Sequence, residues 1–348
     1  MRPIFKLAYP LFAVLFAATL AGCSSGGSSA VASGPPPEQP NIVVDAVPTA
    51  DEAGLYIAQD DGFFAQQGLH VTIRAITGGE YGMADLQDGK AEIVAGNYVS
   101  FILAQIAGEY PAGTPQARSI SMRIIADGSQ MQPGNQALYV LPTSRIKTVA
   151  DLAKYHATVG INTIDNIGQV LLGSLFQQEG LNLSKDITQV VPPEGFPELL
   201  TDLATGRIDA AWLPEPFGTI AEETFGAVEL ADFDQGALQD FPIGAYIGTT
   251  QWVKTHPHTV AAFLRALQQG QQIADTDRAA VETALEGLPA PYNVSKVVAA
   301  TMTIDTYPLV MDVPVMQRVA DAMYQYGVIS KPYKIINMIQ PEPGMINS

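Results

Sequence analysis

The sequence predicts an α/β protein built from two lobes, and two observations support this fold class. One pattern occurs twice, at 85–92 and 202–209: Asp-Leu, two variable residues, Gly, a basic residue, one variable residue and an acidic residue. In both copies an apolar segment follows and ends at a loop with an aromatic residue, which is typical of a helix that stops at glycine before a buried strand. Without its amino-terminal leader the chain keeps about 300 residues, more than one hydrophobic core usually holds.

The leader, residues 1–22, has the pattern of a secretion signal. Arg2 and Lys6 precede an apolar run of about 14 residues, which is short for a membrane span. Residues 20–23, Leu-Ala-Gly-Cys, resemble the bacterial lipobox, in which the cysteine becomes the lipidated first residue of the mature protein. We therefore expect Cys23 to be lipidated. The alternative is a signal peptide with a chance cysteine at its end.

The leader is followed by residues 23–40, which are rich in Ser, Gly and Pro and predict a flexible tether outside the fold. Cys23 is the only cysteine among 348 residues, so the folded part has no disulfide, no thiolate metal site and no cysteine nucleophile. The net charge of −17 argues against nucleic acid or an anionic membrane surface as a partner.

In the first lobe the apolar periodicity predicts strands that alternate with helices. Asp51 and Glu52 suit the first turn of a helix at 53–60, because carboxylates stabilise the positive end of a helix dipole. A tight turn at 78–82 leads into the helix of the first repeat. The remaining predicted elements are strands at 42–47, 70–76, 93–95 and 121–127, a helix that ends at Ala107, and an exposed loop at 109–116.

The second lobe follows the same alternation. Its predicted strands are 137–141, 158–161, 188–191, 208–213 and 228–230, and its helices are a short one that starts within 146–152, one at 166–179 and one at 199–204. Pro214 ends the strand at 208–213, so residues 215–217 leave the sheet at its carboxyl end. In open α/β sheets this end is where ligands bind.

Two segments, a polar connector at 128–136 and the stretch 241–249, are predicted to carry the chain between the lobes. Both contain glycine, as a hinge tolerates, and we expect the lobes to close on a ligand about them. Helices at about 256–274, 278–286, 294–303 and 314–326 then cover the first lobe. The predicted division is therefore a signal peptide at 1–22, a lipidated cysteine and tether at 23–40, lobe 1 at 41–130 plus 245–348, and lobe 2 at 131–244.

The common catalytic and nucleotide-binding motifs are missing from the sequence. It contains no Gly-x-Ser-x-Gly elbow, no phosphate-binding loop and no Gly-x-Gly-x-x-Gly fingerprint. The histidines show no metal-binding spacing, and we expect no metal and no cofactor. Nothing in these patterns supports catalysis.

Several features together resemble substrate-binding lipoproteins of ABC importers. They are the lipobox, the tether, the two repeats, the segment 146–152 (Ile-Lys-Thr-Val-Ala-Asp-Leu) and the segment 212–217 (Trp-Leu-Pro-Glu-Pro-Phe). The resemblance is to the branch of nitrate-, taurine-, sulfonate- and thiamine-precursor-binding proteins (the NMT1/THI5-like family), over about 42–340. It implies a type II periplasmic-binding-protein-like fold, with a ligand between two α/β lobes.

The loops that this fold places on the cleft predict the binding residues. The set is Thr49, Asp51, Tyr56, Gly79, Glu80, Tyr81, Asn97, Tyr98, Gln130, Asn162, Asn166, Trp212, Glu215 and Phe217. These loops contain acidic and aromatic residues but no Lys or Arg, which favours a planar, neutral or amine-bearing ligand. Glu215, held between two prolines, is expected to point into the cleft. Two alternatives stay open: Glu80 faces solvent, and Asp165 caps the helix at 166–179.

The resemblance implies an extracytoplasmic receptor, lipid-anchored on the outer face of the bacterial cell membrane. It would be a monomer that captures a small molecule and delivers it to the permease subunits. We expect a thiamine-type pyrimidine or a similar N-heterocycle; a sulfonate, taurine or nitrate held by helix N-termini is the alternative. An enzyme or sensor domain on the same scaffold is a further alternative. Related pyrimidine-forming enzymes carry a cysteine cluster for iron, which this chain lacks.

Overall fold

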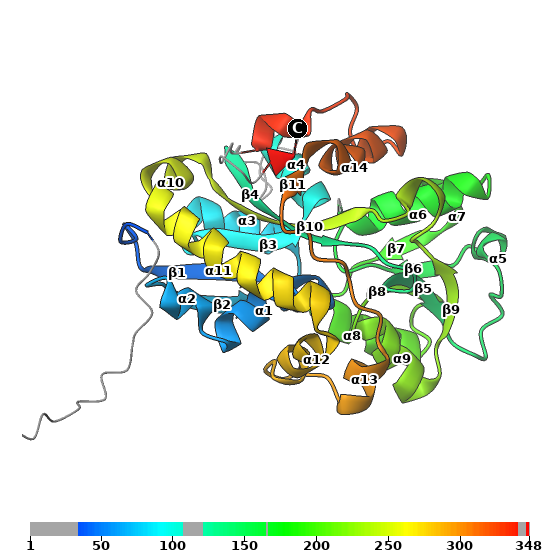
Figure 1. Cartoon of the computed structure of the whole chain (residues 1–348). Coiled ribbons are helices and arrows are strands. Elements are labelled where there is room, and N and C mark those ends of the chain that lie inside the picture. Colours follow the sequence, from blue (N-terminus) through cyan, green and yellow to red (C-terminus); the bar gives the residue numbers. More distant parts are fainter. Residues whose placement is uncertain (1–33, 107–120, 165, 340–345, 348) are drawn as a thin grey trace, which may run out of the picture. The chain divides into compact units, whose positions relative to one another are not determined.

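Two five-stranded sheets form the centre of the computed structural model (Figure 1). The structure describes residues 34–106, 121–164, 166–339 and 346–347, all within the unit Ala32–Ser348. The predicted signal peptide, Cys23 and the loop 109–116 lie outside the described residues. Among the helices that are described, none is long and apolar enough to cross a membrane.

The first sheet has the strand order β2-β1-β3-β10-β4. Its strands are β1 (Asn41–Ala46), β2 (His70–Ala75), β3 (Ile93–Asn97), β4 (Met122–Gln130) and β10 (Pro242–Thr249). The helices that follow its early strands are η1 (Ala50–Glu52), α1 (Ala53–Asp60), α2 (Phe63–Gln66), α3 (Gly79–Asp88) and α4 (Tyr98–Gln105).

The second sheet has the strand order β7-β6-β8-β5-β9. Its strands are β5 (Gln136–Val140), β6 (Thr158–Gly160), β7 (Thr188–Val190), β8 (Ala210–Pro214) and β9 (Val228–Asp232). Its helices are α5 (Val149–Lys154), α6 (Ile167–Gln178), α7 (Leu183–Asp186), α8 (Phe196–Ala204), α9 (Phe217–Phe225) and η3 (Gly236–Leu238). In Figure 1, α6 lies on one face of this sheet and α8 and α9 lie on the other.

The two sheets share one architecture. In each, three parallel strands are followed by a strand that pairs antiparallel on both sides, β10 in the first sheet and β5 in the second. These two strands are the first that the chain forms after each passage between the sheets, at 131–135 and 233–241. The segment 241–249, predicted as the return crossing, is therefore largely a central strand of the first sheet, and the passage between the sheets lies just before it.

The repeated sequence pattern occupies the same place in both sheets, at α3–β3 and at α8–β8. Its glycines, Gly89 and Gly206, have φ of 67° and 69°, a left-handed conformation that glycine adopts without strain. Its last acidic residue accepts a hydrogen bond from the backbone N–H of a neighbouring strand, Glu92 from Val43 at 2.7 Å and Asp209 from Thr158 at 2.9 Å. The pattern is therefore a structural device that joins a helix to two parallel strands.

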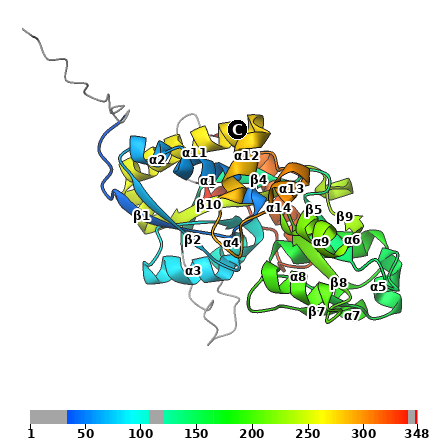
Figure 2. The same cartoon turned by 90° about the horizontal axis from the view of Figure 1, so that it is seen from below.

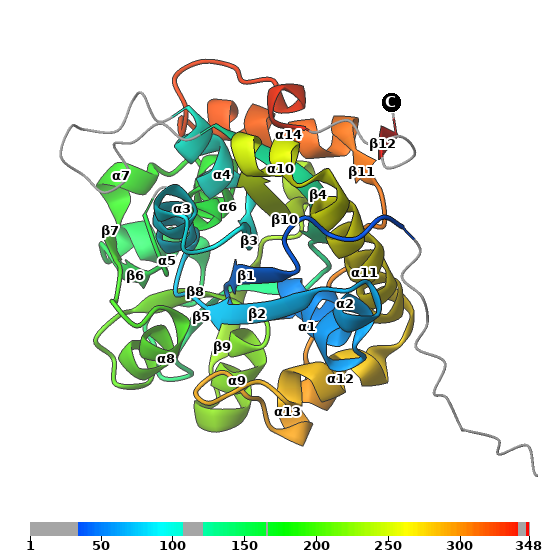
Figure 3. The same ribbon diagram turned by 90° about the vertical axis from the view of Figure 1, so that its left-hand side faces the viewer.

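The carboxyl-terminal helices are α10 (Thr250–Thr255), α11 (Pro257–Thr276), α12 (Arg278–Glu286), α13 (Lys296–Thr301) and α14 (Val313–Gln325), with η4 (Ile335–Met338) and the short strands β11 (Met311–Asp312) and β12 (Ile346–Asn347). Figures 2 and 3 show α1, α2 and α11 on one face of the first sheet and α3 on the other. A buried cluster that includes Leu55, Phe64 and Phe263 fills the space between the first face and its helices.

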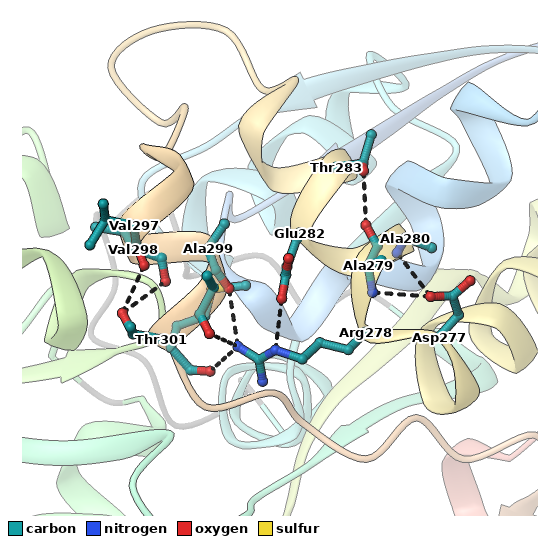
Figure 4. Close-up of polar contacts among 12 residues, drawn as sticks. Asp277, Arg278, Ala279, Ala280, Glu282, Thr283, Val297, Val298, Ala299 and Thr301 are labelled. Carbon is teal, nitrogen blue, oxygen red and sulfur yellow. Dashed lines mark hydrogen bonds and ion pairs between the residues drawn. The ribbon is translucent and has the colours of Figure 1, made fainter.

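Arg278 joins α12 to the end of α13 (Figure 4). Its guanidinium donates to the carbonyl oxygens of Ala299, Ala300 and Met302 at 3.1, 3.0 and 2.8 Å, and to Glu282 at 2.8 Å. Lone carbonyls at a helix C-terminus favour such a cation. The last of these carbonyls, that of Met302, lies three residues before Asp305.

The end of the predicted tether belongs to the fold, contrary to the prediction. The Glu38 carboxylate accepts hydrogen bonds from the backbone N–H groups of His258 and Thr259, at 3.0 and 2.8 Å, and so caps the start of α11. Gln39 accepts a hydrogen bond from Trp252 Nε1 at 2.9 Å. Burial works against the charge, but these bonds lower the pKa of Glu38 to about 2. The sequence alone predicts a flexible tether here, because the hydrogen-bond partners of Glu38 and Gln39 lie more than 200 residues further along the chain and cannot be recognised from the local pattern.

Candidate functional site

A cavity lies between the two sheets, which we call the cleft cavity. Its free space, counting the part that is open to solvent, is about 370 Å³. Its walls come from both sheets and their following loops: Val47, Thr49, Asp51, Glu52, Gly96, Asn97, Ile243 and Gly244 from the first, and Gln136, Asn162, Asn166, Ile167, Phe196, Trp212 and Pro214 from the second. Most of these residues follow or end parallel strands, at the edge where open α/β sheets bind ligands.

The two sides of the cleft cavity touch each other directly. The Ala50 N–H donates to the backbone oxygen of Glu215 at 2.9 Å, and Gln136 Nε2 lies 3.4 Å from Asp51 Oδ1. Asn162 Nδ2 lies 3.4 Å from the backbone oxygen of Thr77. These contacts join the loops after β1 and β2 to the loops of the second sheet, so the cavity is narrow.

Thr49 and two carboxyl groups form the charged wall of the cleft cavity. Thr49 Oγ1 lies 2.8 Å from Asp51 Oδ2 and 2.8 Å from Glu52 Oε2. A hydroxyl group has only one proton to donate, so it cannot donate to both carboxylates. One of the two carboxyl groups must itself be protonated and donate to Thr49.

The pKa values of Asp51 and Glu52 are both raised, but for different reasons. Burial, together with the charge of Asp51, raises the pKa of Glu52 well above its usual range. Burial raises the pKa of Asp51 to only about 6, because bonds from Thr49, Asp305, Ser129 and Gln136 favour its charged form. Of the two groups, Asp51 therefore ionises more readily, and Glu52 keeps a proton to higher pH.

Asp305 lies behind this wall and is a third carboxyl group of the cluster. It is 6% exposed, and burial with the charges of Asp51 and Glu52 raises its pKa well above its usual range. Its carboxyl group bonds to Asp51 and also accepts a hydrogen bond from Asn135 Nδ2. Among the three carboxyl groups, Asp51 is therefore the one whose charged form is favoured most, and a cation beside it would be stabilised.

Aromatic side chains line the opposite wall. Trp212 is 2% exposed, and its Nε1 donates to Gln136 Oε1 at 3.0 Å. Phe196 meets Trp212 edge to face at 5.5 Å between ring centroids and stacks on Phe217 at 5.1 Å. Phe217 does not line the cavity; it supports Phe196 from behind. Such a wall suits a flat ring.

The helix N-termini at the cleft cavity have side-chain caps of their own. Asn97 Oδ1 accepts from the Ser100 N–H at 2.9 Å at the start of α4, and Asn166 Oδ1 accepts from the Gly168 N–H at 2.8 Å at the start of α6. Asn166 also donates to Asn162 Oδ1 at 2.9 Å. One first-turn N–H group at each of these two helix ends is thus already bonded and is not free for an anion.

The structure brings part of the predicted set to the cleft cavity: Thr49, Asp51, Asn97, Asn162, Asn166 and Trp212. Tyr98 is fully buried in the first sheet's layer and donates to Asp127 Oδ1 at 2.7 Å. Tyr81 is 51% exposed, Gly79 begins α3 beside Ser100, and Gln130 pairs through its backbone with Thr306. Tyr56 faces a different cavity. The Glu80 side chain and Asp165 lie outside what the structure describes.

Glu215 is the main correction to the predicted set. Its side chain is 4% exposed and is absent from the walls of the cleft cavity. The carboxylate accepts from Thr219 Oγ1 at 2.7 Å and from the Thr219 N–H at 3.3 Å. Because α9 begins two residues after Glu215, free N–H groups of its first turn lie within reach. The structure therefore places this carboxylate at the start of α9. Burial raises its pKa to about 7, although the Thr219 bonds oppose this.

Sequence reasoning missed several residues of the site, above all Glu52, Gln136, Phe196 and Asp305. Glu52 was assigned only to a helix start, and Gln136 is a polar residue at the first position of an apolar strand, a pattern that could have indicated a buried contact. Nothing near Asp305 in the sequence indicates the cleft. Among the described residues, no group of His, Cys, Asp or Glu is arranged to hold a metal ion.

Known proteins share this fold. The alkanesulfonate-binding protein SsuA of Xanthomonas axonopodis, bound to MOPS, superposes with a TM-score of 0.69 at 17% identity, over 87% of this chain and 99% of that chain. The periplasmic nitrate-binding protein NrtA of Synechocystis gives a TM-score of 0.69 at 16% identity, over 86% of this chain and 84% of that chain. The arrangement matches the type II periplasmic-binding-protein fold that the sequence predicts.

Sequence comparison gives the family. The bicarbonate transport ATP-binding protein CmpC of Synechocystis is 25% identical over 248 residues, which are 66% of this chain and 34% of that protein. The chain spans about a third of the length of the curated relatives it matches. A family model described as the NMT1-like family matches residues 35–286. The chain therefore belongs to the NMT1-like family.

Proposed function

We propose that this protein is the extracytoplasmic solute-binding component of an ABC importer, and that it captures a small flat molecule with a cationic or NH-bearing edge. A thiamine-type aminopyrimidine or a similar N-heterocycle has this chemistry. The observation that carries the proposal is the cleft cavity itself. Its charged wall residues are the carboxyl groups of Asp51 and Glu52, while Trp212 and Phe196 offer ring surfaces opposite.

The charge of the site favours this ligand class over an anion. Asp51 keeps its charge more readily than Glu52 and Asp305 do, and an ammonium or amidine edge would form a charge-assisted hydrogen bond with it. No described Lys or Arg lines the cleft cavity. A sulfonate, taurine or nitrate remains the second candidate, because SsuA and NrtA are named for such ligands.

A thermal-shift screen would identify the ligand class. The panel should contain aminopyrimidines, sulfonates, taurine, nitrate and bicarbonate, each with the full chain. A ligand at 100 times its dissociation constant adds about 2.7 kcal/mol of stability. We expect the cationic N-heterocycles to raise the melting temperature most and to be recovered chemically unchanged, as a receptor rather than an enzyme would leave them.

Asp51→Asn tests the proposed charge recognition in this ligand class. The substitution removes the ionised carboxylate while keeping its size, so affinity for the strongest cationic ligand should fall about ten- to a hundredfold by calorimetric titration.

In the wild type, the same affinity should decline about tenfold per pH unit below pH 6, because the pKa of Asp51 lies at about 6.

Asp321→Asn, an exposed change on α14, serves as the control and should leave the affinity unaltered. If a sulfonate or nitrate bound instead, and bound more tightly to Asp51→Asn than to the wild type, the cationic ligand class would be wrong and the importer role would stand.

We further propose that Cys23 anchors the protein to the outer face of the membrane, where it delivers its ligand as a monomer to permease subunits. Cys23→Ser should move the protein from the membrane fraction to the soluble extracytoplasmic fraction, since no lipid can be attached. Ligand affinity should be unchanged, because the site is built by residues from Val47 onward. Membrane retention of the variant in cells that lipidate proteins would contradict the anchor.

A further inference from the structure

A second cavity lies on the other side of the turn between β1 and η1. Pro48 lines this second cavity, whereas its neighbours Val47 and Thr49 line the cleft cavity. The two cavities share no wall residue. Counting the part that is open to solvent, the space is about 580 Å³ in the second cavity, against about 370 Å³ in the cleft cavity. We call it the α1–α12 cavity, because α1, the end of β2 and the end of α12 form its walls.

The walls of the α1–α12 cavity combine apolar surface with two phenol groups. Ile73 and Leu288 contribute aliphatic surface, and Tyr56 and Tyr292 contribute the rings. Tyr56 is 6% exposed. Among the described residues its hydroxyl group has no hydrogen-bond partner, although buried polar groups are nearly always paired. Water or a ligand in the cavity can therefore serve as the partner of this hydroxyl group.

The rim of the α1–α12 cavity is acidic. Asp60 lines both this cavity and an adjoining hollow, whose wall also includes Asp61 and Asp277. Asp277 is engaged at the start of α12, where it accepts from the N–H groups of Ala279 and Ala280 (Figure 4). Burial and the charge of Asp61 raise the pKa of Asp60. A cation bound beside Asp60 would favour its charged form and oppose this rise. No described Lys or Arg lines either hollow.

We propose that the α1–α12 cavity is a second binding site, for a small aromatic amine whose ring lies against Tyr56 and Tyr292 and whose ammonium group meets Asp60. The aromatic and aliphatic walls match a ring, and a carboxylate at the rim matches the charge. The site goes beyond the capture of a transported solute, because it lies outside the cleft cavity.

An occupant of this site would act on the segment that forms the cleft cavity. Glu52 and Tyr56 lie one helical turn apart, with Glu52 on the cleft cavity and Tyr56 on the α1–α12 cavity. A ligand that held Tyr56 would therefore restrict the turn that presents Asp51 and Glu52. Such coupling between two sites is reciprocal in binding free energy.

The test uses 2-phenylethylamine as the probe, titrated calorimetrically into the full chain near pH 7.5. Gly287→Leu adds a side chain at the cavity wall. A Cβ at Gly287 meets only the backbone oxygens of Ala284 and Thr283 at 3.4 Å, so the first carbon of the new side chain fits without a clash. We expect Gly287→Leu to weaken the probe at least tenfold, and Asp60→Asn and Tyr56→Phe to weaken it about two- to tenfold each. Melting temperatures check that each variant is folded.

Asp51→Asn is the matched control, because Asp51 lines the cleft cavity and does not line the α1–α12 cavity. Affinity that survives in Asp51→Asn and falls in Gly287→Leu supports the second site. Affinity that falls in Asp51→Asn and survives in Gly287→Leu would show that the probe enters only the cleft cavity. That result would overturn the proposal without touching the proposed receptor function. Absence of binding to the wild type, or equal binding by all variants, would overturn it as well.

Discussion

Gly270→Ala is expected to lower the melting temperature by about 6 °C or more, a large effect for a single methyl group. An added Cβ at this position would lie 2.0 Å from the backbone oxygen of Gly54 and 2.9 Å from the backbone nitrogen of Ala58. These are backbone atoms of α1, so no side chain can turn away, and α11 must move off α1. Overpacking of this kind lowers the free energy of unfolding by about 3 kcal/mol. Each kcal/mol corresponds to about 2–4 °C of melting temperature in a chain of this size.

Gly287→Ala is the matched control for this prediction. Its backbone is helical, with φ of −77°, and a Cβ there has only ordinary contacts at 3.4 Å. The same substitution should therefore be neutral or should stabilise by a few tenths of a kcal/mol, through the entropy of the unfolded chain. Equal melting temperatures for Gly270→Ala and Gly287→Ala would contradict the close crossing of α1 and α11.

The ligand-free protein is expected to lose stability as the pH rises from 5 to 8, and Asp127 should account for roughly 2.5 kcal/mol of the change. Asp127 is 2% exposed, and its Oδ2 has no partner among the described residues. Burial raises the pKa of Asp127 from 3.8 to about 7, although bonds from Tyr98 and the Gly128 N–H oppose the rise. The native state thus keeps a proton that the unfolded chain releases.

The sign of this effect follows from the raised pKa. The stabilisation is complete below about pH 4, declines as the pH rises, and is lost above pH 7. Urea unfolding at pH 5, 6, 7 and 8 measures it. Asp127→Asn should reduce the change in unfolding free energy between pH 5 and 8 by this amount. The carboxyl groups of the cleft cavity also have raised pKa values, so the variant should still lose some stability as the pH rises. An Asp127→Asn variant as pH-sensitive as the wild type would contradict the assignment.

The sequence predicted the fold well because the relevant information is local. Each repeat places an Asp, a Gly and a basic residue within six positions, and the salt bridge from Asp202 to Arg207, at 2.7 Å, forms within that span. Helix caps were equally local: Thr148 and Asp151 form a reciprocal capping box at the start of α5. Patterns of this kind need no knowledge of the rest of the chain.

The candidate site was only partly predictable, because side-chain direction depends on distant partners. Asp51 and Trp212 could be found from their positions next to strand ends. Asp305 could not, because it lies more than 250 residues after Asp51 and its position depends on distant contacts. Asn135 bonds to its carboxyl group, and Arg278 bonds to the carbonyl oxygen of Met302 just before it. Glu215 was misplaced for the opposite reason: a partner four residues away, Thr219, competes with the cleft for its carboxylate.

The environments of the two tryptophans have an optical consequence. The chain contains two such residues, Trp212 and Trp252. Trp212 lies in the wall of the cleft cavity with its indole N–H bonded to Gln136, whereas Trp252 bonds to Gln39 and stacks on His256 beside the start of α11. Their emission therefore reports on two separate events, filling of the cleft and docking of residues 38–40. With Trp252 replaced by phenylalanine, the remaining fluorescence would follow the cleft alone.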